Sequence, residues 1–540
     1  MSATANSAAD SAVKIDPITV EVIGSALASI TEEMGEALVR ASYSTNIKER
    51  RDCSTALFDV AGNTLCQAEH VPMHLGSFLG AIPAITSRFP IDTIRPGDAF
   101  IGNDAYEGGG THLPDIVLAE PIFVDGKVVA WAINTAHHSD FADRGHAHIY
   151  QEGLRIPPVR LYRKGELQED IQRLFLLNCQ VPHERISDLR AQIAANRLGV
   201  IRMQELCAKY GVETVLDAGD ELMDYAERKM RAGISLIPDG TYSFDDIFDS
   251  ESLDVPLPLS VTITVKGDEI ALDFVSPPQV RAGLNVVYTA LLATVYYAIK
   301  TVVDPTVLPN AGLARPITVN AEEGTLLRCA HPAAVDGRIT ACQRVVDLIH
   351  GALAQVVPER VTAASNGSVA VASFDGRRPD GGLWVYLETI GGGFGARYNK
   401  DGLDGVHVHM TNTSNLPVEA LENEYPITLR RYELVDGSGG AGEFVGGMGL
   451  RRVYRAEKAC RVQVMGARLS TRPWGLEGGE PGASGHFSLN GVRSGFEKAS
   501  VDLVAGDILE IVTPGAGGYG DPQARTLENR ARDLREKRFA

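Results

Sequence analysis

The chain has 540 residues, a hydrophobic fraction of 44% and a formal net charge of −18 at pH 7. This length predicts two to four domains with sizeable cores, and the composition is that of a globular protein. The acidic balance excludes a nucleic-acid partner, because phosphate binding needs clustered Lys and Arg on the surface.

Cysteine usage and the N-terminal segment both predict a cytoplasmic protein. The seven cysteines are widely spaced and form no Cys-x-x-Cys pair, which is typical of reduced thiols. Residues 1–14 are small and polar and lack the apolar core of a signal peptide. The most apolar helix candidate, 283–299, contains Asn285 and Tyr288 and is interpreted as a core helix, so no membrane partner is expected.

The first predicted element is a long amphipathic helix that ends near Ser42. Asp16 and Pro17 are the residue types of an N-cap and a first helical position, and apolar residues then recur at helical spacing. A short hairpin follows, with strands over 55–59 and 64–67 joined by a Gly-containing turn.

A second hairpin, with strands over 116–124 and 127–135, carries the most informative residues. Asp125-Gly126 is a strong signal for a two-residue turn, because type I′ turns require positive φ. If these two residues form the loop, Leu113 lies opposite His138 and Pro114 lies opposite His137. The open end of the hairpin then gathers four side chains that can bind a metal ion: His112, Asp115, His137 and His138.

These side chains predict a divalent-metal site. Opposed side chains in an antiparallel pair lie roughly 5 Å apart, and their neighbours one step along remain within reach. A mixed imidazole and carboxylate set suits Mn, Fe or Zn. The alternative is that His137 and His138 are buried strand residues hydrogen-bonded to the backbone. We favour the metal site, because several ligands arrive together beside a Gly-rich segment.

The remaining elements predict an α+β fold, mixed and multi-domain. Helices are expected over 184–210 and 213–232, strands over 242–249, 260–265 and 269–275, and further helices over 286–301 and 340–355. From about residue 360 the chain is Gly-rich with short β-type runs. We therefore expect a metal-site region with an N-terminal helix and β-hairpins (15–180), a central helical and strand region (181–360) and a Gly-rich, mainly β region (361–525), with soft boundaries.

The Gly-rich segments 391–395 and 515–520 are candidate nucleotide-binding loops. Neither carries the Lys-Ser/Thr of a phosphate loop, and no helix pattern opens directly after residue 395. We interpret them as tight turns near a pocket wall. The sequence therefore predicts that this chain has no ATP site of its own.

Two further segments are candidates for substrate binding. Alternation over 404–413 predicts a strand with His407 and His409 on a polar face, which either lines an active cleft or is a solvated sheet face. The mixed-charge stretch 48–52, which includes Arg51 and Asp52, is typical of a solvated surface, with anion or substrate binding as the alternative.

Motifs along most of the chain resemble the hydantoinase B/oxoprolinase family. They occur in the family's order between about residues 15 and 525, and together they are highly specific. The segments are 44–52, Asn103-Asp104-x-Tyr106, 111–115, 136–138, 151–158, 404–413, 417–422, 446–449 and 514–522.

The resemblance implies a metal-containing B-type subunit of an ATP-dependent cyclic-amide hydrolase, acting on a lactam, hydantoin or oxoproline. It places a metal, usually manganese in related acetone carboxylase subunits, on His112, Asp115 and His137. It also implies a hetero-oligomer with an A-type subunit, which binds ATP and phosphorylates the amide or carbonyl oxygen. Alternatives are a subunit of an ATP-dependent ketone carboxylase and a non-catalytic scaffold for the A-type subunit.

Site residues beyond the metal ligands are also expected. His138 and Asp140 directly follow a ligand and are the first candidates for proton transfer. Arg51, Asp52, Asp104 and His409 are candidate substrate contacts. The segment 139–150 departs from many relatives, so it either tunes substrate choice or is a plain surface connection.

Overall fold

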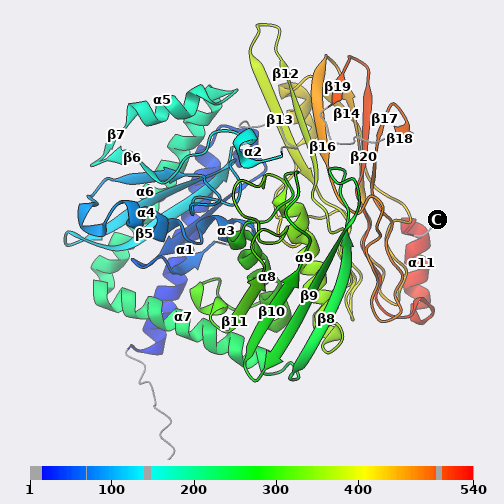
Figure 1. Cartoon of the computed structure of the whole chain (residues 1–540), viewed down its shortest axis with the longest axis horizontal. Coiled ribbons are helices and arrows are strands. Elements are labelled where there is room, and N and C mark those ends of the chain that lie inside the picture. The colour runs from blue at the N-terminus through cyan, green and yellow to red at the C-terminus, as the bar shows by residue number, and fades with distance from the viewer. Residues whose placement is uncertain (1–14, 69, 139–146, 494–500, 539–540) are drawn as a thin grey trace, which may run out of the picture.

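The computed structural model describes residues 15–68, 70–138, 147–493 and 501–538. The N-terminal sheet and its helices lie on the left of Figure 1, the central sheet below the middle, and the C-terminal sheets on the right. Helices and several separate sheets alternate along the chain, so the predicted α+β class is confirmed. No helix within the described ranges is long and apolar enough to cross a membrane.

The first sheet has seven strands in the order β2-β1-β5-β4-β3-β6-β7, and all its neighbouring strands are antiparallel. These strands are β1 (Cys53–Phe58), β2 (Thr64–Gln67), β3 (Ala99–Gly102), β4 (Asp115–Val124), β5 (Lys127–His137), β6 (Val159–Arg163) and β7 (Glu166–Leu167). One face packs on α1 (Pro17–Ala41), α6 (Pro182–Tyr210) and α7 (Val212–Ile234), and the other on α3 (His74–Phe78) and α4 (Ala81–Arg88). Two shorter helices accompany this sheet, α2 (Thr45–Lys48) and α5 (Glu169–Leu177).

Helix α1 forms where its sequence signals place it. The Asp16 carboxylate accepts a hydrogen bond from the Thr19 backbone N–H at 3.0 Å, and Pro17 begins the helix. Its apolar stripe is buried against α6, where Gly199 lets the two helices approach closely. A Cβ at Gly199 would lie 2.4 Å from the sulfur of Met34, so a larger residue would require the buried Met34 side chain to move.

Strands β4 and β5 form the predicted hairpin, but its register differs by one residue from the prediction. Asp125 and Gly126 have φ of 49° and 76°, as the two-residue turn requires. Phe123 pairs with Val128, whereas Ile122 pairs with Ala130, so Val129 is an extra residue in β5 and forms a β-bulge. The predicted pairing of Pro114 with His137 is therefore wrong, and Asp115 lies opposite His137 instead.

The second sheet has the order β11-β10-β9-β8 and shares one large core with two apolar helices. Its elements are β8 (Gly240–Phe248), β9 (Leu257–Lys266), β10 (Glu269–Val275), β11 (Ile317–Ala321), α8 (Tyr288–Val303) and α9 (Arg338–Leu353). The predicted helices and strands of this region are confirmed apart from small shifts at their ends. Helices α6 and α7 come after residue 181 but pack on the first sheet, and the domain boundaries stay a prediction.

The C-terminal region contains two sheets that share one hydrophobic core, with strand orders β13-β12-β16-β19 and β14-β15-β20-β17-β18. Its strands are β12 (Ala370–Arg377), β13 (Leu383–Ile390), β14 (Ile427–Leu434), β15 (Leu450–Ala456), β16 (Cys460–Met465), β17 (His486–Leu489), β18 (Val492–Arg493), β19 (Val501–Leu503) and β20 (Ile508–Val512). Its helices are α10 (Val418–Glu424) and α11 (Leu527–Glu536). Single 3₁₀ turns cover Ile91–Thr93, Ile149–Gln151, Ala311–Ala314, Pro358–Arg360 and Pro522–Ala524.

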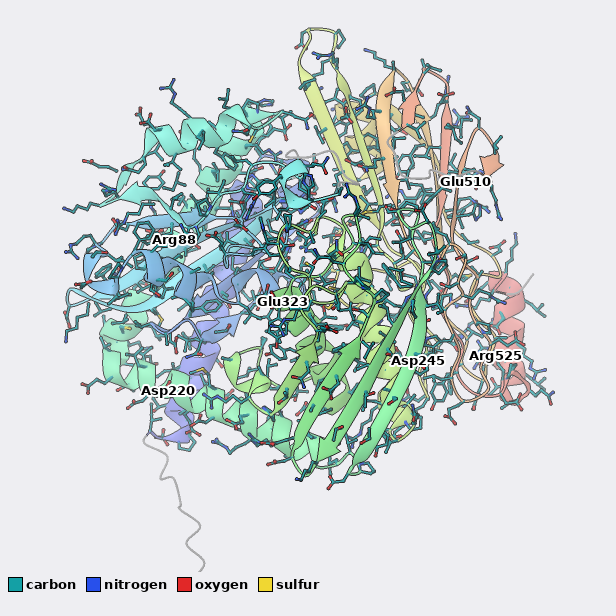
Figure 2. The ribbon with its side chains drawn as sticks, in the orientation of Figure 1. Arg88, Asp220, Asp245, Glu323, Glu510 and Arg525 are labelled. Atoms are coloured by element: carbon teal, nitrogen blue, oxygen red, sulfur yellow. The ribbon has the colours of Figure 1, made fainter. Side chains whose placement is uncertain are left out.

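Ion pairs stabilise this region both at the helix α11 and inside its core. Arg525, labelled in Figure 2, holds α11 through ion pairs with Asp401 at 2.9 Å and Asp533 at 2.5 Å. Inside the core, Arg452 and Glu388 form a 2.8 Å ion pair in which both side chains are 0% exposed.

The Gly-rich segments pack backbone against backbone. A Cβ at Gly393 would lie 2.2 Å from the carbonyl oxygen of Gly447, and one at Gly517 would lie 1.9 Å from that of Trp474. These glycines are therefore explained by close chain packing without any nucleotide.

The strand predicted over 404–413 is wrong. The segment contributes only an isolated bridge, between Val406 and Gly392, and His409 adopts a positive φ of 48° that no strand residue has.

Candidate functional site

Three side chains meet where β4 begins and β5 ends: His112, Asp115 and His137, hereafter the triad. Their potential ligand atoms all lie within 4.8 Å of one another, and all three residues are buried. Asp115 Oδ1 is 2.9 Å from His112 Nε2 and 3.3 Å from His137 Nδ1. The structure thus brings together the three residues that the hairpin and the family motifs indicated.

Strand alternation decides which histidine joins the triad. Every second residue of a strand faces the same side of the sheet. Trp131 and Ile133 of β5 face the side covered by α3 and α4, so His137, two steps of this alternation after Ile133, faces that side as well. The next residue, His138, faces α6 instead, and its Nε2 lies 3.0 Å from Gln192 Oε1. The structure does not bring His138 to the triad.

Two further residues beside the triad are His74, which the sequence did not single out, and Asp52, which it named only as a substrate contact. His74 Nε2 lies 3.9 Å from Asp115 Oδ1 and 3.6 Å from Asp52 Oδ1. The other ring nitrogen of His74 is hydrogen-bonded to Ser54 Oγ at 2.8 Å, which fixes the direction of the ring. His74 is the first residue of the short helix α3 and is separated from the hairpin by many residues. No motif or spacing in the sequence therefore links it to the hairpin ligands.

Arg338 holds the far oxygen of the central carboxylate. Its Nη2 donates to Asp115 Oδ2 at 2.9 Å and its Nε donates to Thr111 Oγ1 at 2.8 Å. Ser77 Oγ donates to the same Oδ2 at 3.2 Å, so Oδ1 is left facing the imidazoles. Arg338 is the first residue of α9, a contact that spans more than two hundred residues of sequence and that periodicity does not reveal.

The site's electrostatics favour the metal-binding form of Asp115, His137 and the neighbouring His74, but not that of His112. Burial lowers the pKa of His74 and of His137, so both imidazoles are neutral at neutral pH. Burial alone would raise the pKa of Asp115, but His112 and Arg338 outweigh it and hold that pKa well below its usual range. Burial and the Arg338 charge lower the pKa of His112, but contacts with Asp115 and Asp336 outweigh them, so this pKa is raised. A cation that binds His112 must therefore displace its proton.

The surroundings of the triad fit a metal ion. The three triad residues line a cavity of about 50 Å³, hereafter the triad cavity. Asp52, His74 and Arg338 line it as well. Within the described part of the chain, the buried Nε2 of His137 has no hydrogen-bond partner. The Nδ1 of His112 donates to the Asp336 carbonyl oxygen at 3.0 Å, which turns Nε2 toward Asp115, an arrangement common for metal-bound histidines.

The remaining expected residues lie elsewhere. Arg51 is exposed and pairs with Glu36 at 2.8 Å, as the solvated-surface interpretation predicts, whereas its neighbour Arg50 is 0% exposed and donates to the Leu387 carbonyl oxygen. Asp104 is buried in a 2.7 Å ion pair with Arg155. It does not line the triad cavity, nor a second, larger cavity that shares Val71 and Thr411 with the triad cavity. Asp140 and most of the segment 139–150 lie outside the described residues.

His409 lines that larger cavity, which adjoins the triad cavity. Its Nε2 lies 3.6 Å from Asp347 Oδ1, and its ring packs edge-on against His350 of α9. None of the seven cysteines forms a disulfide.

His350 should make stability depend on pH. Burial lowers its pKa to about 3. An unfolded imidazole binds a proton below about pH 6.5, which the folded one does not bind until near pH 3, so stability falls as the solution is acidified through this window. We expect His350→Gln to reduce that slope by up to about 1.4 kcal/mol per pH unit between about pH 4 and 6. Urea unfolding at several pH values measures the slope, and an unchanged slope in the variant would contradict the assignment.

The family follows from a comparison with protein-family models. The model described as hydantoinase B/oxoprolinase matches residues 16–522. The chain belongs to this family.

Individual relatives agree with the family match along almost the whole chain. A protein from Pseudomonas sp. (strain NS671), named as a putative B-type subunit of a D-/L-hydantoinase, is 34% identical, over 95% of this chain and 92% of the relative. The beta subunit of the caprolactamase of Pseudomonas jessenii is 32% identical, over 96% of this chain and 94% of the relative.

Solved structures show the same fold. The crystal structure of the ATP-dependent caprolactamase from Pseudomonas jessenii matches with a TM-score of 0.87 and 30% identity, covering 97% of this chain and 94% of that chain. A nucleotide-free acetone carboxylase also matches with a TM-score of 0.87, covering 97% of this chain and 78% of that one, but its 18% identity establishes the fold alone.

Proposed function

We propose that this chain is the metal-containing B-type subunit of an ATP-dependent cyclic-amide hydrolase. The observation that carries the proposal is the buried triad, in a family whose relatives are named for hydantoin and caprolactam hydrolysis. The proposal includes an A-type partner subunit in a cytoplasmic hetero-oligomer. The partner binds ATP and phosphorylates the amide oxygen, because amide resonance makes the ring carbonyl a poor electrophile.

The residues divide the work within the triad cavity. His112, Asp115 and His137 would hold Mn, Zn or Fe, all of which accept imidazole and carboxylate ligands. A divalent ion there would supply Lewis acidity, which polarises a carbonyl oxygen and lowers the pKa of water. Arg338 keeps Asp115 anionic and correctly turned, since it neutralises the oxygen that faces away from the imidazoles.

The groups that we expect to transfer protons line the triad cavity. Burial would raise the pKa of Asp52, but His137, His74 and Arg50 outweigh burial and keep that pKa lowered, so Asp52 is an anion. We propose that Asp52 and the neutral His74 beside it accept the proton of the attacking water. The position of His138 against α6 does not favour it for this role, and Asp140 stays a candidate beyond the described residues.

The purified chain alone should hydrolyse no ATP, and the mixture with its A-type partner should couple ATP hydrolysis to ring opening. The reason is that no Gly-rich turn of this chain is followed by the Lys-Ser/Thr of a phosphate loop. The assay compares this chain, the partner and the mixture on caprolactam, hydantoin and 5-oxoproline, and on a ketone with and without bicarbonate.

Each outcome of that assay is informative. Ring opening only by the mixture supports the proposal. Bicarbonate-dependent turnover of the ketone alone would favour a carboxylase subunit instead. Full activity of the partner without this chain would reduce the chain to a scaffold, and lactam-stimulated ATP hydrolysis by this chain alone would contradict the division of labour.

A further inference from the structure

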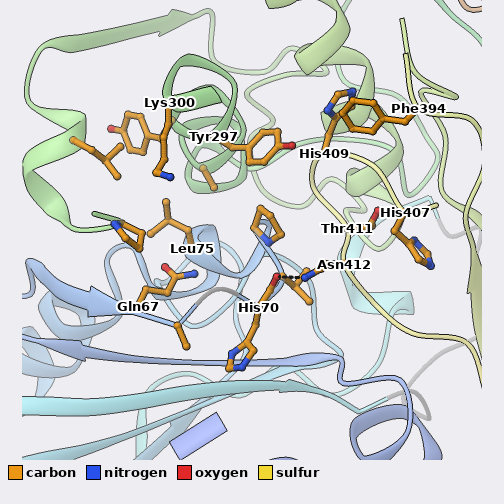
Figure 3. Close-up of a pocket in the computed structure, with 17 residues that line it drawn as sticks. Gln67, His70, Leu75, Tyr297, Lys300, Phe394, His407, His409, Thr411 and Asn412 are labelled. Carbon is orange, nitrogen blue, oxygen red and sulfur yellow. Dashed lines mark hydrogen bonds between the residues drawn. The ribbon is translucent and has the colours of Figure 1, made fainter. Parts of the chain in front are cut away.

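We propose that the cyclic amide binds in the larger cavity beside the triad, with its ring carbons on an aromatic wall and its amide group at the end next to the triad. This inference rests on the proposed function and names the binding site for its substrate. This cavity is hereafter the aromatic cavity, because Tyr296, Tyr297 and Phe394 form an aromatic wall in it. Its volume of about 400 Å³ suits a small organic molecule (Figure 3). The triad cavity alone, at about 50 Å³, is too small to hold such a ring.

The two cavities adjoin. Val71 and Thr411 line both of them. His407 lines the aromatic cavity, and its Nε2 lies 3.4 Å from the hydroxyl of Thr413, which lines the triad cavity. A ring in the aromatic cavity can therefore present its amide bond to the triad past Thr411 while most of its atoms stay outside the smaller space.

Apolar and polar side chains both line the cavity. Figure 3 shows His407, Thr411 and Asn412 on one side, and Leu75 together with Gln67 and Lys300 on the other. Among the described lining residues no carboxylate occurs and Lys300 is the one cation, so the cavity suits a ligand that is neutral or carries a single negative charge. A cyclic amide has these properties, because its methylene groups need an apolar wall and its N–H and C=O need hydrogen-bonding partners.

His409 is rigidly held at the edge of the aromatic cavity. It is 4% exposed, and its ring contacts those of Tyr297 and Phe394 at centroid distances of 6.1 and 5.6 Å. Asp347 lies 3.6 Å from its Nε2. Its positive φ of 48° costs conformational energy for a residue other than glycine, and such strain persists where the surroundings fix a side chain at a functional site. The position of His409 at the edge of the cavity is thus fixed by its neighbours.

Two variants test the cavity without touching the triad. Ala293 is a buried cavity-lining residue of α8, and Ala293→Phe should fill part of the space, whereas Tyr297→Leu removes part of the aromatic wall. In the complex with the A-type partner, we expect KM for caprolactam and hydantoin to rise by ~10–100-fold, the range for altered hydrophobic contacts in a pocket. Metal content, measured by elemental mass spectrometry, should equal that of the unaltered chain. Tyr225→Leu, an exposed tyrosine on α7, is the matched control.

The outcomes separate the two proposals. Raised KM with full metal content in either folded variant supports the aromatic cavity, and Tyr297→Leu decides alone if Ala293→Phe does not fold. Unchanged KM in a folded, metal-replete Tyr297→Leu complex overturns the cavity assignment and leaves the proposed function standing. If the unaltered complex opens no cyclic amide at all, the proposed function fails and the cavity assignment fails with it.

Discussion

Changing His137 to Gln is expected to remove the bound divalent ion and the hydrolytic activity together, whereas His138→Gln should leave the ion in place. His137 points toward Asp115 at 3.3 Å, while His138 points toward Gln192 on the other face of the sheet. Loss of a group that merely supports a ligand costs ~10–100-fold in metal affinity. We therefore expect loss of a ligand itself to exceed that range.

The two substitutions form a matched pair, because they replace neighbouring buried imidazoles by the same side chain. Metal content after gel filtration measures occupancy, and circular dichroism checks that each variant remains folded. Full occupancy in His137→Gln, or loss of the ion from a folded His138→Gln, would show that the triad is not the metal site.

Glu388→Gln should lower the free energy of unfolding by about 3–5 kcal/mol, the cost of leaving a buried charge without its partner. Glu388 pairs with Arg452 at 2.8 Å, and both side chains are 0% exposed. The same carboxylate accepts hydrogen bonds from the hydroxyls of Tyr386 and Tyr454, so its charge is shared by a buried polar network. An amide keeps the shape of the carboxylate but leaves the guanidinium uncompensated.

Urea unfolding of Glu388→Gln and of a surface control measures the difference. Asp502→Asn is suitable, because Asp502 is an exposed partner of Arg461 at 3.1 Å, and pairs of this kind contribute about 0–1 kcal/mol. Equal, small losses in both variants would mean that the buried pair contributes no more than a surface pair.

The sequence predicts local structure well where one segment contains its own signals. The helix cap at Asp16, the long amphipathic helices and the Asp125-Gly126 turn all lie where their patterns place them. The triad could be named because the turn brings its members to one end of a single hairpin.

Long-range contacts could not be predicted from periodicity. His74 and Arg338 reach the triad from helix starts that are distant in sequence, so no spacing rule links them to Asp115. The segment 404–413 alternates like a strand, yet it forms only one isolated bridge, and the positive φ of His409 interrupts any regular pairing.

The bulge at Val129 has a consequence for any exchange of this hairpin between relatives. If Val129 were paired with Ile122 and did not bulge, the two-residue turn would pair Asp115 with Ala136, and His138 would share its face while His137 turned toward α6. Deleting Val129 itself would keep Asp115 opposite His137 in a regular ladder, whereas adding or removing a single residue of β5 between the bulge and the triad would swap the two histidines. A graft therefore preserves the orientation of the ligands only when it keeps the pairing of Ile122 with Ala130 and the strand lengths from that pair to the triad.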